Sequence, residues 1–355
     1  MIRKNRNAKL PRKPGFYVGA ILIAVFYLAA LFAGFFSPYD YREQTRQQPS
    51  APASVIRFSD AAGNFSPHLR VYGVRMTDAI AQEYSVDESQ SAPVQFFVHG
   101  YSYLILGLIA SDVHLFGVGK DGPETPRVNL LGTDALGRDR FSRLLNGIRF
   151  SLLVSPLGTI MAAILGVLIG IVSGYSGRVV DSGLMGIADA MISLPTLILI
   201  LAARAAFPLE LPPITAAGLL IGIFALTGWA EMARLARGQV RAIREREFVI
   251  AATATGVKPF WILVRHILPN ISAPLVTQTI LMLPAFLLAE AALSFLGVGL
   301  QEPEPSLGNL LTAGADLTEL TAHPLLVLSP AIAIFLFVLG IRLVSDARSK
   351  RLDGT

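Results

Sequence analysis

The stretch REREFVIAATATGVKPFWILVRHILPN, residues 244–270, decides how this chain folds. It contains four basic and two acidic side chains, yet it lies between two segments, 212–230 and 273–297, that are each apolar enough to cross a bilayer. A transmembrane helix needs about 20 mainly apolar residues, and charged side chains are costly at membrane depth. The stretch therefore lies in water at the membrane surface, between two helices that cross the membrane.

The composition indicates a protein that crosses the membrane several times. Of its 355 residues, 53% are hydrophobic and only 15% are charged, and the mean hydropathy is +0.55. An ordinary soluble domain has about 25% charged residues. The sequence predicts an all-α polytopic membrane protein, and an even number of spans places both termini on one side. The six predicted transmembrane helices cover residues 16–36, 151–173, 184–206, 212–230, 273–297 and 324–341.

The basic segment 1–15 begins like a signal peptide. The apolar run that follows it is about 20 residues long, whereas the apolar region of a signal peptide usually has about 7–15. The sequence FAGFFSPYD at the end of this run offers no cleavage site with small residues. We therefore expect residues 16–36 to be a retained transmembrane helix.

Basic residues set the predicted orientation. Segment 1–15, the loop 231–272 and the tail from Arg342 are rich in Lys and Arg, whereas the short loops 207–211 and 298–323 contain neither. Because cytoplasmic loops have the excess of Lys and Arg, we expect both termini and the 231–272 loop to be cytoplasmic. The formal charge of +5 then reflects topology, and nucleic acid is not an expected partner.

Residues 37–150 form a long insertion between the first two spans, which we expect to be extracytoplasmic. Its segment VIRFSDAAGNFSPHLRVYGV, residues 55–74, contains two β-type runs around a Gly63-Asn64 turn signal, and further β-type runs follow. A small β-rich domain is predicted. The apolar run Tyr103–Ala110 is too short to span a membrane, so we expect a buried strand there. The scattered histidines lack metal-ligand spacing, and no metal site is predicted.

The insertion ends in a predicted amphipathic helix. Phe141, Leu144, Leu145 and Ile148 recur at helical spacing, which places them on one face. Arg138, Arg140, Arg143 and Arg149 surround that face. We expect this helix to lie at the outer membrane interface, either as a lead-in to the second span or as a contact for gating or a partner.

Two acidic residues lie within predicted spans. Asp189 is near the cytoplasmic end of the third span, and Glu290 is deep in the fifth, between apolar neighbours. Ionisable groups at membrane depth usually face a cavity or a partner. Asp189 is therefore either simply hydrated or functional. Glu290 either forms a hydrogen bond or ion pair between helices or lines a pathway. Pro195 and Pro284 predict kinks in the same two spans.

The charged loop itself is predicted to form a helical bracket, residues 237–270. Arg237–Thr255 is a good helix-forming stretch and Gly256 is a natural residue to end it. A second short helix begins at Pro259 and runs towards His266, and we expect Pro269 to stop it. One side of the bracket is apolar, through Phe248, Val249, Ala252, Phe260 and Leu263. A loop that only needed solvation would not have this face, so we expect a docking surface for a soluble partner.

Several motifs of the chain resemble those of a known family. Ile250-Ala251-Ala252, Gly256 and Ile267-Leu268-Pro269 resemble the "EAA" loop of binding-protein-dependent ABC importer permeases. The chain is most similar to the C-type membrane subunit of dipeptide and oligopeptide importers. That subunit has LLGTDxxGRD…SRLL…GxRxSL, found here from Leu130 to Leu152, then EREFVxAA…G…RHxLPN. It also has EAALSFLGVGxQ, found here from Glu290 to Gln301.

The resemblance implies a fold and partners. It implies the type I ABC importer (MetI-like) fold over residues 151–345, followed by a cytoplasmic tail, 346–355. It implies that this chain is no enzyme, but pairs with a homologous B-type permease, two ATPase subunits that bind ATP and Mg, and an extracytoplasmic substrate-binding protein. The bracket would be the coupling helix, with its ATPase contacts at Glu247, Ile250, Ala251, Ala252, Gly256, His266, Leu268 and Pro269. The first position of EAA is Ile250, so the acidic contact is missing there, and Glu247 is expected to supply it from the same helical face.

Other functions remain open at this point. The chain has no G-x-x-x-x-G-K-[ST] motif, so ATP must be bound by another chain, and neither G-x-S-x-G nor HExxH occurs. The transported solute is expected to be a peptide, with a nickel chelate or an oligosaccharide as alternatives. An ion-coupled secondary transporter using Asp189 and Glu290 is a further alternative. A membrane scaffold without transport activity is another.

Overall fold

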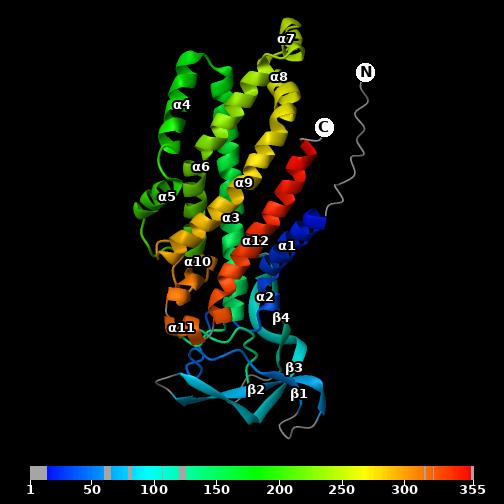
Figure 1. Cartoon of the computed structure of the whole chain (residues 1–355), viewed down its shortest axis with the longest axis vertical. Helices are drawn as coiled ribbons and strands as arrows, with labels where there is room; N and C mark the ends of the chain where they lie inside the picture. The colour runs from blue at the N-terminus through cyan, green and yellow to red at the C-terminus, as the bar shows by residue number, and fades with distance from the viewer. Residues whose placement is uncertain are drawn as a thin grey trace.

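The structure is a computed structural model that describes residues 14–59, 65–78, 82–105, 107–119, 125–315, 317–322 and 324–352. Figure 1 shows an elongated bundle of helices with a sheet at one end and the short helices α7 and α8 at the other. Most of the basic segment 1–15 and the Gly63-Asn64 turn lie outside the described residues.

The long helices run along the bundle. They are α1 (Pro14–Leu31), α3 (Arg140–Tyr175), α6 (Pro213–Arg244), α9 (Leu268–Phe295) and α12 (Pro324–Leu352). Shorter helical segments join them: α2 (Ala33–Phe36), α4 (Arg178–Ile192), α5 (Thr196–Ala205), α7 (Glu247–Ala254), α8 (Pro259–Ile262), a π-helical turn η1 (Leu263–Ile267), α10 (Leu307–Leu310), a 3₁₀ turn η2 (Leu311–Ala315) and α11 (Leu317–Ala322).

Five helical segments of the described chain are long and apolar enough to cross a membrane, and the bent pair α4–α5 makes a sixth if it counts as one span. The pair bends by 91° between Ile192 and Thr196. Pro195 is the N-cap residue of α5, and proline cannot continue the helix that precedes it. The predicted kink at Pro195 is therefore a sharp break between two helices. Pro284, by contrast, lies inside the uninterrupted helix α9.

The core of the bundle is the packing of α3 against α6. A Cβ atom on Gly166 would lie 2.5 Å from the carbonyl oxygen of Trp229, and one on Gly170 would lie 2.4 Å from that of Ala233. Only glycine allows two helix backbones to approach this closely. Buried apolar side chains of α3, α5, α6 and α9, among them Phe224 and Phe286 stacked at 4.8 Å, fill the space around this contact.

The helices extend further than the sequence predicts. The expected amphipathic helix before the second span is not separate, because α3 continues from Arg140 through the apolar segment to Tyr175. Arg138, Arg140 and Arg143 are buried rather than arranged around an interfacial helix. Likewise α6 continues past residue 230 to Arg244, and α12 past residue 341 to Leu352.

The insertion contains the predicted β-structure. Four antiparallel strands, β1 (Ile56–Ser59), β2 (Phe65–Asp78), β3 (Glu83–Ile105) and β4 (Ile109–Val118), follow one another in order. A small core of Val71, Ala92 and Val128 lies beneath them. The prediction of one buried strand at Tyr103–Ala110 is wrong. This run is the end of β3, a turn and the start of β4, and Leu108 there is 83% exposed.

Candidate functional site

The bracket at the end of the bundle begins where α6 ends. Three residues after Arg244, α7 starts at Glu247 and runs to Ala254. A turn leads to α8, and the π-helical turn η1 joins α8 to α9. The predicted helix over 237–255 is thus two helices with a break at Glu245. Pro269 does not stop a helix, because it lies in the first turn of α9, where a missing backbone N–H costs nothing.

Gly256 ends α7 in the way that the sequence predicts. Its φ of +79° is in the left-handed region, which a residue with a Cβ atom enters only at a steric cost. The N–H of Gly256 donates to the carbonyl of Thr253 at 3.0 Å, and the N–H of Val257 donates to that of Ala252 at 3.2 Å. These two hydrogen bonds form a Schellman motif, which fixes the direction in which the chain leaves α7.

Buried side chains attach the bracket to the bundle. Val249, Ile262 and Ile267 are each 3% exposed or less and belong to the same apolar core as α3, α6 and α9. Ala252 and Leu263 are half-buried and pack against that core. The apolar residues predicted to share one docking face are therefore divided, because three of the five face inwards and only Phe248 and Phe260 are exposed.

A second apolar set in the bracket is exposed. Its members are large side chains that the described chain leaves uncovered: Phe248, Ile250, Val257, Phe260, Trp261 and Val264. Ile250 and Trp261 are each 57% exposed, and Phe260 is 65% exposed. We call these six residues the outer bracket surface. Large apolar side chains that stay exposed among polar residues often mark a protein interaction site.

The remaining predicted contact residues surround the outer bracket surface. Glu247 and Ala251 are exposed on α7, and His266 is half-buried with its ring 6.3 Å from that of Phe248. Glu247 and Ile250 are both exposed and three residues apart on one helix, so their side chains are neighbours. Leu268 is half-buried and Pro269 is exposed at the start of α9. The carboxylate of Glu247 therefore lies next to Ile250, where the acidic residue of the motif is missing.

An ion-pair cluster connects α6 to α4 close to the bracket. Asp181 is only 6% exposed, and its carboxylate accepts hydrogen bonds from Arg237 Nε and Nη2 at 2.5 and 2.7 Å. Arg241 Nη2 donates to it at 2.6 Å and Ser173 Oγ at 2.5 Å. Sequence reasoning missed Asp181. It is the fourth residue of α4, and its partners Arg237 and Arg241 are four residues apart on α6.

Asp189, which the sequence singles out, lies on the surface of α4. Its carboxylate pairs with Arg234 Nη1 at 3.2 Å, and both side chains are more than half exposed. An exposed ion pair of this kind contributes about 0–1 kcal/mol to stability. The α4–α6 contact therefore contains one buried charge cluster, at Asp181, and one exposed pair, at Asp189.

Glu290 is fully buried between three helices. It accepts hydrogen bonds from Ser151 Oγ of α3 at 2.6 Å and from Ser294 Oγ of its own helix at 2.9 Å. Ser151 Oγ in turn accepts from the backbone N–H of Leu307, the first residue of α10. This arrangement favours an interhelical hydrogen-bond role over exposure to a pathway, since both carboxylate oxygens already have partners.

A cavity of about 490 Å³ lies between α4, α5, α6 and α9. Most of its lining is apolar, from side chains such as Ile200 and Met282. Thr196, Thr227, Glu231 and Gln278 add polar groups. The 91° bend at Pro195 turns α5 away from α4 and opens this space beside α6 and α9.

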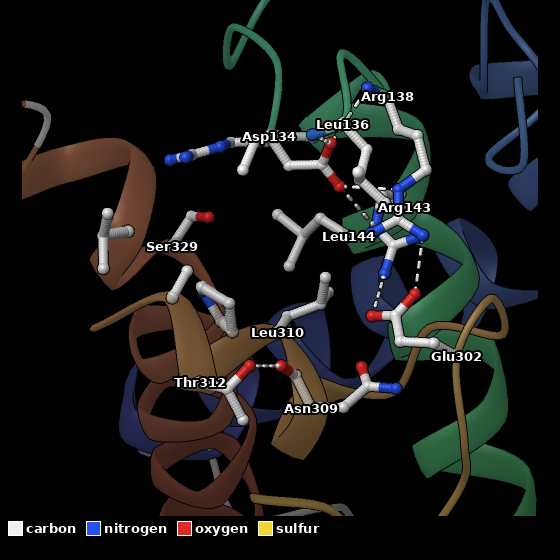
Figure 2. Close-up of a pocket in the computed structure, with 15 residues that line it drawn as sticks. Asp134, Leu136, Arg138, Arg143, Leu144, Glu302, Asn309, Leu310, Thr312 and Ser329 are labelled. Atoms are coloured by element: carbon white, nitrogen blue, oxygen red, sulfur yellow. Dashed lines mark hydrogen bonds and ion pairs between the residues drawn. The ribbon is translucent and has the colours of Figure 1, made fainter. Parts of the chain in front are cut away.

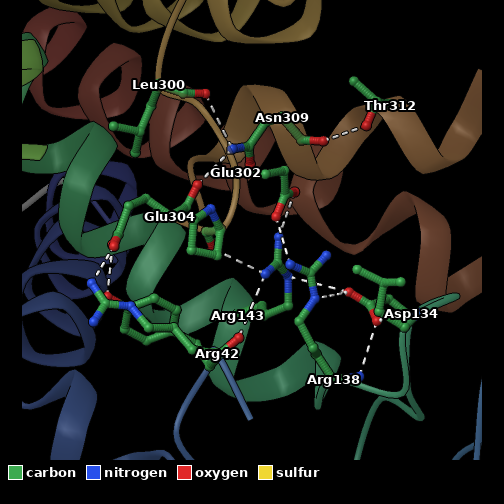
Figure 3. A network of polar contacts seen from close by, with 12 residues as sticks. Arg42, Asp134, Arg138, Arg143, Leu300, Glu302, Glu304, Asn309 and Thr312 are labelled. Carbon is green, nitrogen blue, oxygen red and sulfur yellow. Dashed lines mark hydrogen bonds and ion pairs between the residues drawn. The ribbon is translucent and has the colours of Figure 1, made fainter. Parts of the chain in front are cut away.

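The end of the bundle next to the sheet has its own charge network (Figure 3). Arg138 Nε donates to Asp134 Oδ2 at 2.7 Å and Arg138 Nη1 to Glu302 Oε2 at 2.6 Å. Arg143 Nη2 donates to the other oxygen of Glu302 at 2.8 Å. Figure 2 shows both guanidinium groups turned towards these carboxylates at the edge of a cavity of about 270 Å³. The network holds the loop before α3 against the loop after α9.

Local backbone geometry explains the residues of the 130–139 motif. Asp134 Oδ1 accepts the N–H groups of Leu136 and Arg138, each at 2.9 Å, which closes a tight turn. Asp139 caps α3 by accepting the N–H of Ser142, and its burial raises the pKa of this carboxyl to about 6. Gly132 and Gly137 have positive φ angles, and a Cβ atom on either would lie within 2.2 Å of a backbone oxygen of residues 45–51.

Comparisons with known proteins agree with this organisation. Residues 166–354 match the family described as "Binding-protein-dependent transport system inner membrane component". Residues 8–53 match the "N-terminal TM domain of oligopeptide transport permease C". The sheet lies between these two ranges.

Relatives and solved structures are also similar to the chain. A dipeptide transport system permease protein of Bacillus subtilis is 36% identical over 222 residues, which are 62% of this chain and 67% of the relative. An oligopeptide transport system permease protein of Mycobacterium tuberculosis is 34% identical over 223 residues, 63% of this chain and 75% of the relative. A structure of the MetNI methionine ABC transporter, in an inward-facing conformation, is 19% identical and covers 58% of this chain and 96% of its own, with a TM-score of 0.41.

Proposed function

The chain belongs to the family of binding-protein-dependent transport system inner membrane components, and from this membership we propose that it forms half of a translocation pathway for dipeptides or oligopeptides. Such components are permease subunits that span the inner membrane, and ATP hydrolysis belongs to separate subunits. The proposed partners are a homologous B-type permease, two ATPase subunits that bind ATP and Mg, an extracytoplasmic binding protein that delivers the peptide, and membrane lipid.

The outer bracket surface is the observation that carries the proposal. Its six apolar side chains lie on a bracket that is attached by Val249, Ile262 and Ile267 and ended by the left-handed Gly256. A rigid apolar surface matches the needs of a helix that docks into a groove of another protein. We assign the docking role to this surface together with Glu247, whose carboxylate replaces the one missing at Ile250. Ala252 supports the surface from beneath rather than contacting the partner.

The proposed orientation follows from the positions of the two ends. The bracket and the sheet lie at opposite ends of the bundle, and the end of α12 lies towards the bracket (Figure 1). With basic residues concentrated at the bracket end, that end is cytoplasmic and the sheet is extracytoplasmic. In this orientation, the bent pair α4–α5 forms the third of six membrane spans.

Movement of the bracket would reach the pathway through α6. This helix continues from the bracket into the bundle without a break, and Asp181 ties its last two turns to α4. The cavity of about 490 Å³ lies between α4, α5, α6 and α9, next to the parts that such a movement would displace. We propose that this cavity is the chain's share of the pathway, with Thr227, Glu231 and Gln278 offering polar contacts to a passing peptide.

The test is peptide uptake into liposomes that contain the permease pair and the ATPase subunits, with the binding protein outside. We expect uptake that needs ATP and the binding protein and that continues when an uncoupler collapses the ion gradients. Uptake that the uncoupler abolishes and ATP does not drive would instead support ion-coupled transport. If nickel chelates or oligosaccharides are taken up in place of peptides, the proposed ATP-driven mechanism stands and the proposed substrate is wrong.

A further inference from the structure

The hairpin between β3 and β4 has a tip without charge. Residues 100–111 read GYSYLILGLIAS and contain no ionisable group except the two tyrosines. Leu104, Leu108 and Ile109 are 51%, 83% and 63% exposed, and Gly107 makes the turn with a φ of +73°. Hairpin turns in water are normally built from Asn, Asp, Gly and Ser. An exposed turn made of leucine and isoleucine therefore indicates that something other than water surrounds it.

Contacts with the helices show which way the hairpin points. Near the base of β4, the ring of Phe116 lies 6.2 Å from that of Phe141, in the first turn of α3. Two residues further along, His114 Nδ1 lies 2.8 Å from the carbonyl oxygen of Gly34, in the helical turn that follows α1. Gly34 falls within the predicted first span, 16–36. The strand thus rises from the start of one membrane helix to the end of another, and Figure 1 shows β4 beside α2.

The tip continues beyond that level. Ile109 is five residues past His114, which in an extended strand corresponds to about 16 Å. Tyr103, the last tyrosine before the tip, packs against Gly34 so closely that a Cβ atom there would lie 2.3 Å from its ring. The hairpin is therefore held against α2 at His114 and Tyr103, while the apolar residues beyond Tyr103 have no covering group among the described residues.

The side chains along the hairpin change in the order expected at a membrane surface. In the middle of the hairpin, where His99 is opposite Val113, His99 Nδ1 and Asp112 Oδ2 form an exposed pair at 3.0 Å. Tyr101 and Tyr103 come next, and the Tyr103 hydroxyl donates to the carbonyl of Val113 at 2.6 Å. Beyond them lie only Leu, Ile, Gly and Ala. Charges in water, tyrosines at the interface and aliphatic side chains inside are the usual order at a bilayer surface.

We infer that the hairpin tip, defined by Leu104, Ile105, Leu108, Ile109 and Ala110, inserts into lipid of the leaflet on the sheet side of the membrane. The helix α1, which precedes the α2 turn that the hairpin contacts, exposes Ile21, Val25 and Leu28 by 52–61%, as a helix facing lipid does. The tip would extend this lipid-facing surface. Insertion is shallow, on the order of 5–10 Å, because a two-stranded hairpin leaves unpaired backbone groups at its edges that hydrocarbon cannot solvate.

The chain has no cysteine, which makes a direct test simple. Leu108→Cys, Leu28→Cys and Ser89→Cys are each labelled with a nitroxide in the complete complex, reconstituted in liposomes. All three positions are exposed, so the substitutions should not disturb folding. Collision rates are then measured with oxygen, which concentrates in lipid, and with a nickel chelate, which stays in water.

We expect the label at 108 to meet oxygen several-fold more often than the nickel chelate, as at position 28 in the spanning helix. The label at 89, on the water-exposed part of β3, should show the opposite preference. A label at 108 that behaves like the one at 89 would place the tip in water and overturn the inference. A label at 108 that meets neither reagent would mean that another protein subunit covers the tip, which would overturn it equally.

Discussion

Asp181 Oδ1 on α4 lies 2.5 Å from Arg237 Nε on α6, and the carboxylate side chain is 8% exposed while that of the arginine is 27% exposed. Arg237 is two turns before the end of α6, and α7 begins three residues after that helix ends, at Glu247. The pair therefore joins the end of α6, which leads to the proposed docking surface, to α4, which leads into the bend at Pro195. A force applied at the bracket would reach α4 through this contact.

We predict that Asp181→Asn uncouples the transporter. The substitution removes the charge that two arginines share, and it leaves two like charges close together without a counter-charge. ATPase subunits should still bind, because the outer bracket surface is unchanged, but stimulation of ATP hydrolysis by the loaded binding protein should fall by tenfold or more. The matched control is Asp189→Asn, which breaks the exposed pair between the same two helices. Equal effects of both variants would contradict a special role for Asp181.

Glu290 gives a prediction about stability. Glu290→Gln preserves a hydrogen-bond acceptor for Ser151, whereas Glu290→Leu leaves Ser151 and Ser294 without their partner inside the bundle. Loss of such a hydrogen bond in a membrane protein costs about 1–2 kcal/mol. We expect the leucine variant to unfold at a lower temperature in a thermal-shift assay and the glutamine variant to stay near the parent. Unchanged stability of both variants, with reduced uptake, would instead indicate a pathway role.

The network of Arg143 allows a comparison of buried and exposed ion pairs. Arg143 is 1% exposed and contacts Glu302, whereas Arg57 and Glu88 form an exposed pair at 3.3 Å in the sheet. Breaking an exposed pair typically costs about 0–1 kcal/mol, whereas truncating Arg143 also removes the packing of a buried side chain. Arg143→Ala should therefore lower the midpoint of thermal unfolding clearly, and Arg57→Ala should not. Similar midpoints for the two variants would show that the network adds little to stability.

The sequence predicted the helical class, the β-rich insertion and Gly256 because each depends on local signals. Apolar runs of membrane length, alternating β-type residues and a glycine after a helix can all be read along one segment. The ends of the helices could not be predicted in the same way. Arg140 and Arg143 look like surface residues in the sequence, and they are buried only because loops distant in the chain supply Glu302 and the other partners.

At the bracket, too, some features follow from local sequence and others depend on the folded structure. Ile250 and Trp261 are recognised as apolar residues in a charged loop, but whether each faces the bundle depends on the break at Glu245 and on the π-helical turn η1. Neither irregularity has a clear sequence signal. Asp181 escaped notice for another reason. It lies in the short segment between the predicted spans 151–173 and 184–206, and its arginine partners are 56 and 60 residues away along the chain.

The proposed orientation can be tested with single cysteines. Ser89→Cys in the sheet should react with a membrane-impermeant thiol reagent added to intact cells, whereas Thr255→Cys in the bracket should react only after the membrane is opened. Both side chains are exposed, so access to the reagent is limited only by the membrane. Labelling at 255 in intact cells, with protection at 89, would reverse the topology.

The central claim is that the outer bracket surface is where the ATPase subunits bind, and the most direct measurement is how much ATPase co-purifies with each permease variant. Gly256→Val forces a β-branched residue into the left-handed region, and Trp261→Asp places a charge on the surface itself. Gly177→Val is the control, because Gly177 has a φ of −68° and open space around it. We predict that both bracket variants insert and pair with the sister permease but lose most of the ATPase, while the control retains it. Normal amounts of ATPase on both bracket variants would contradict the claim.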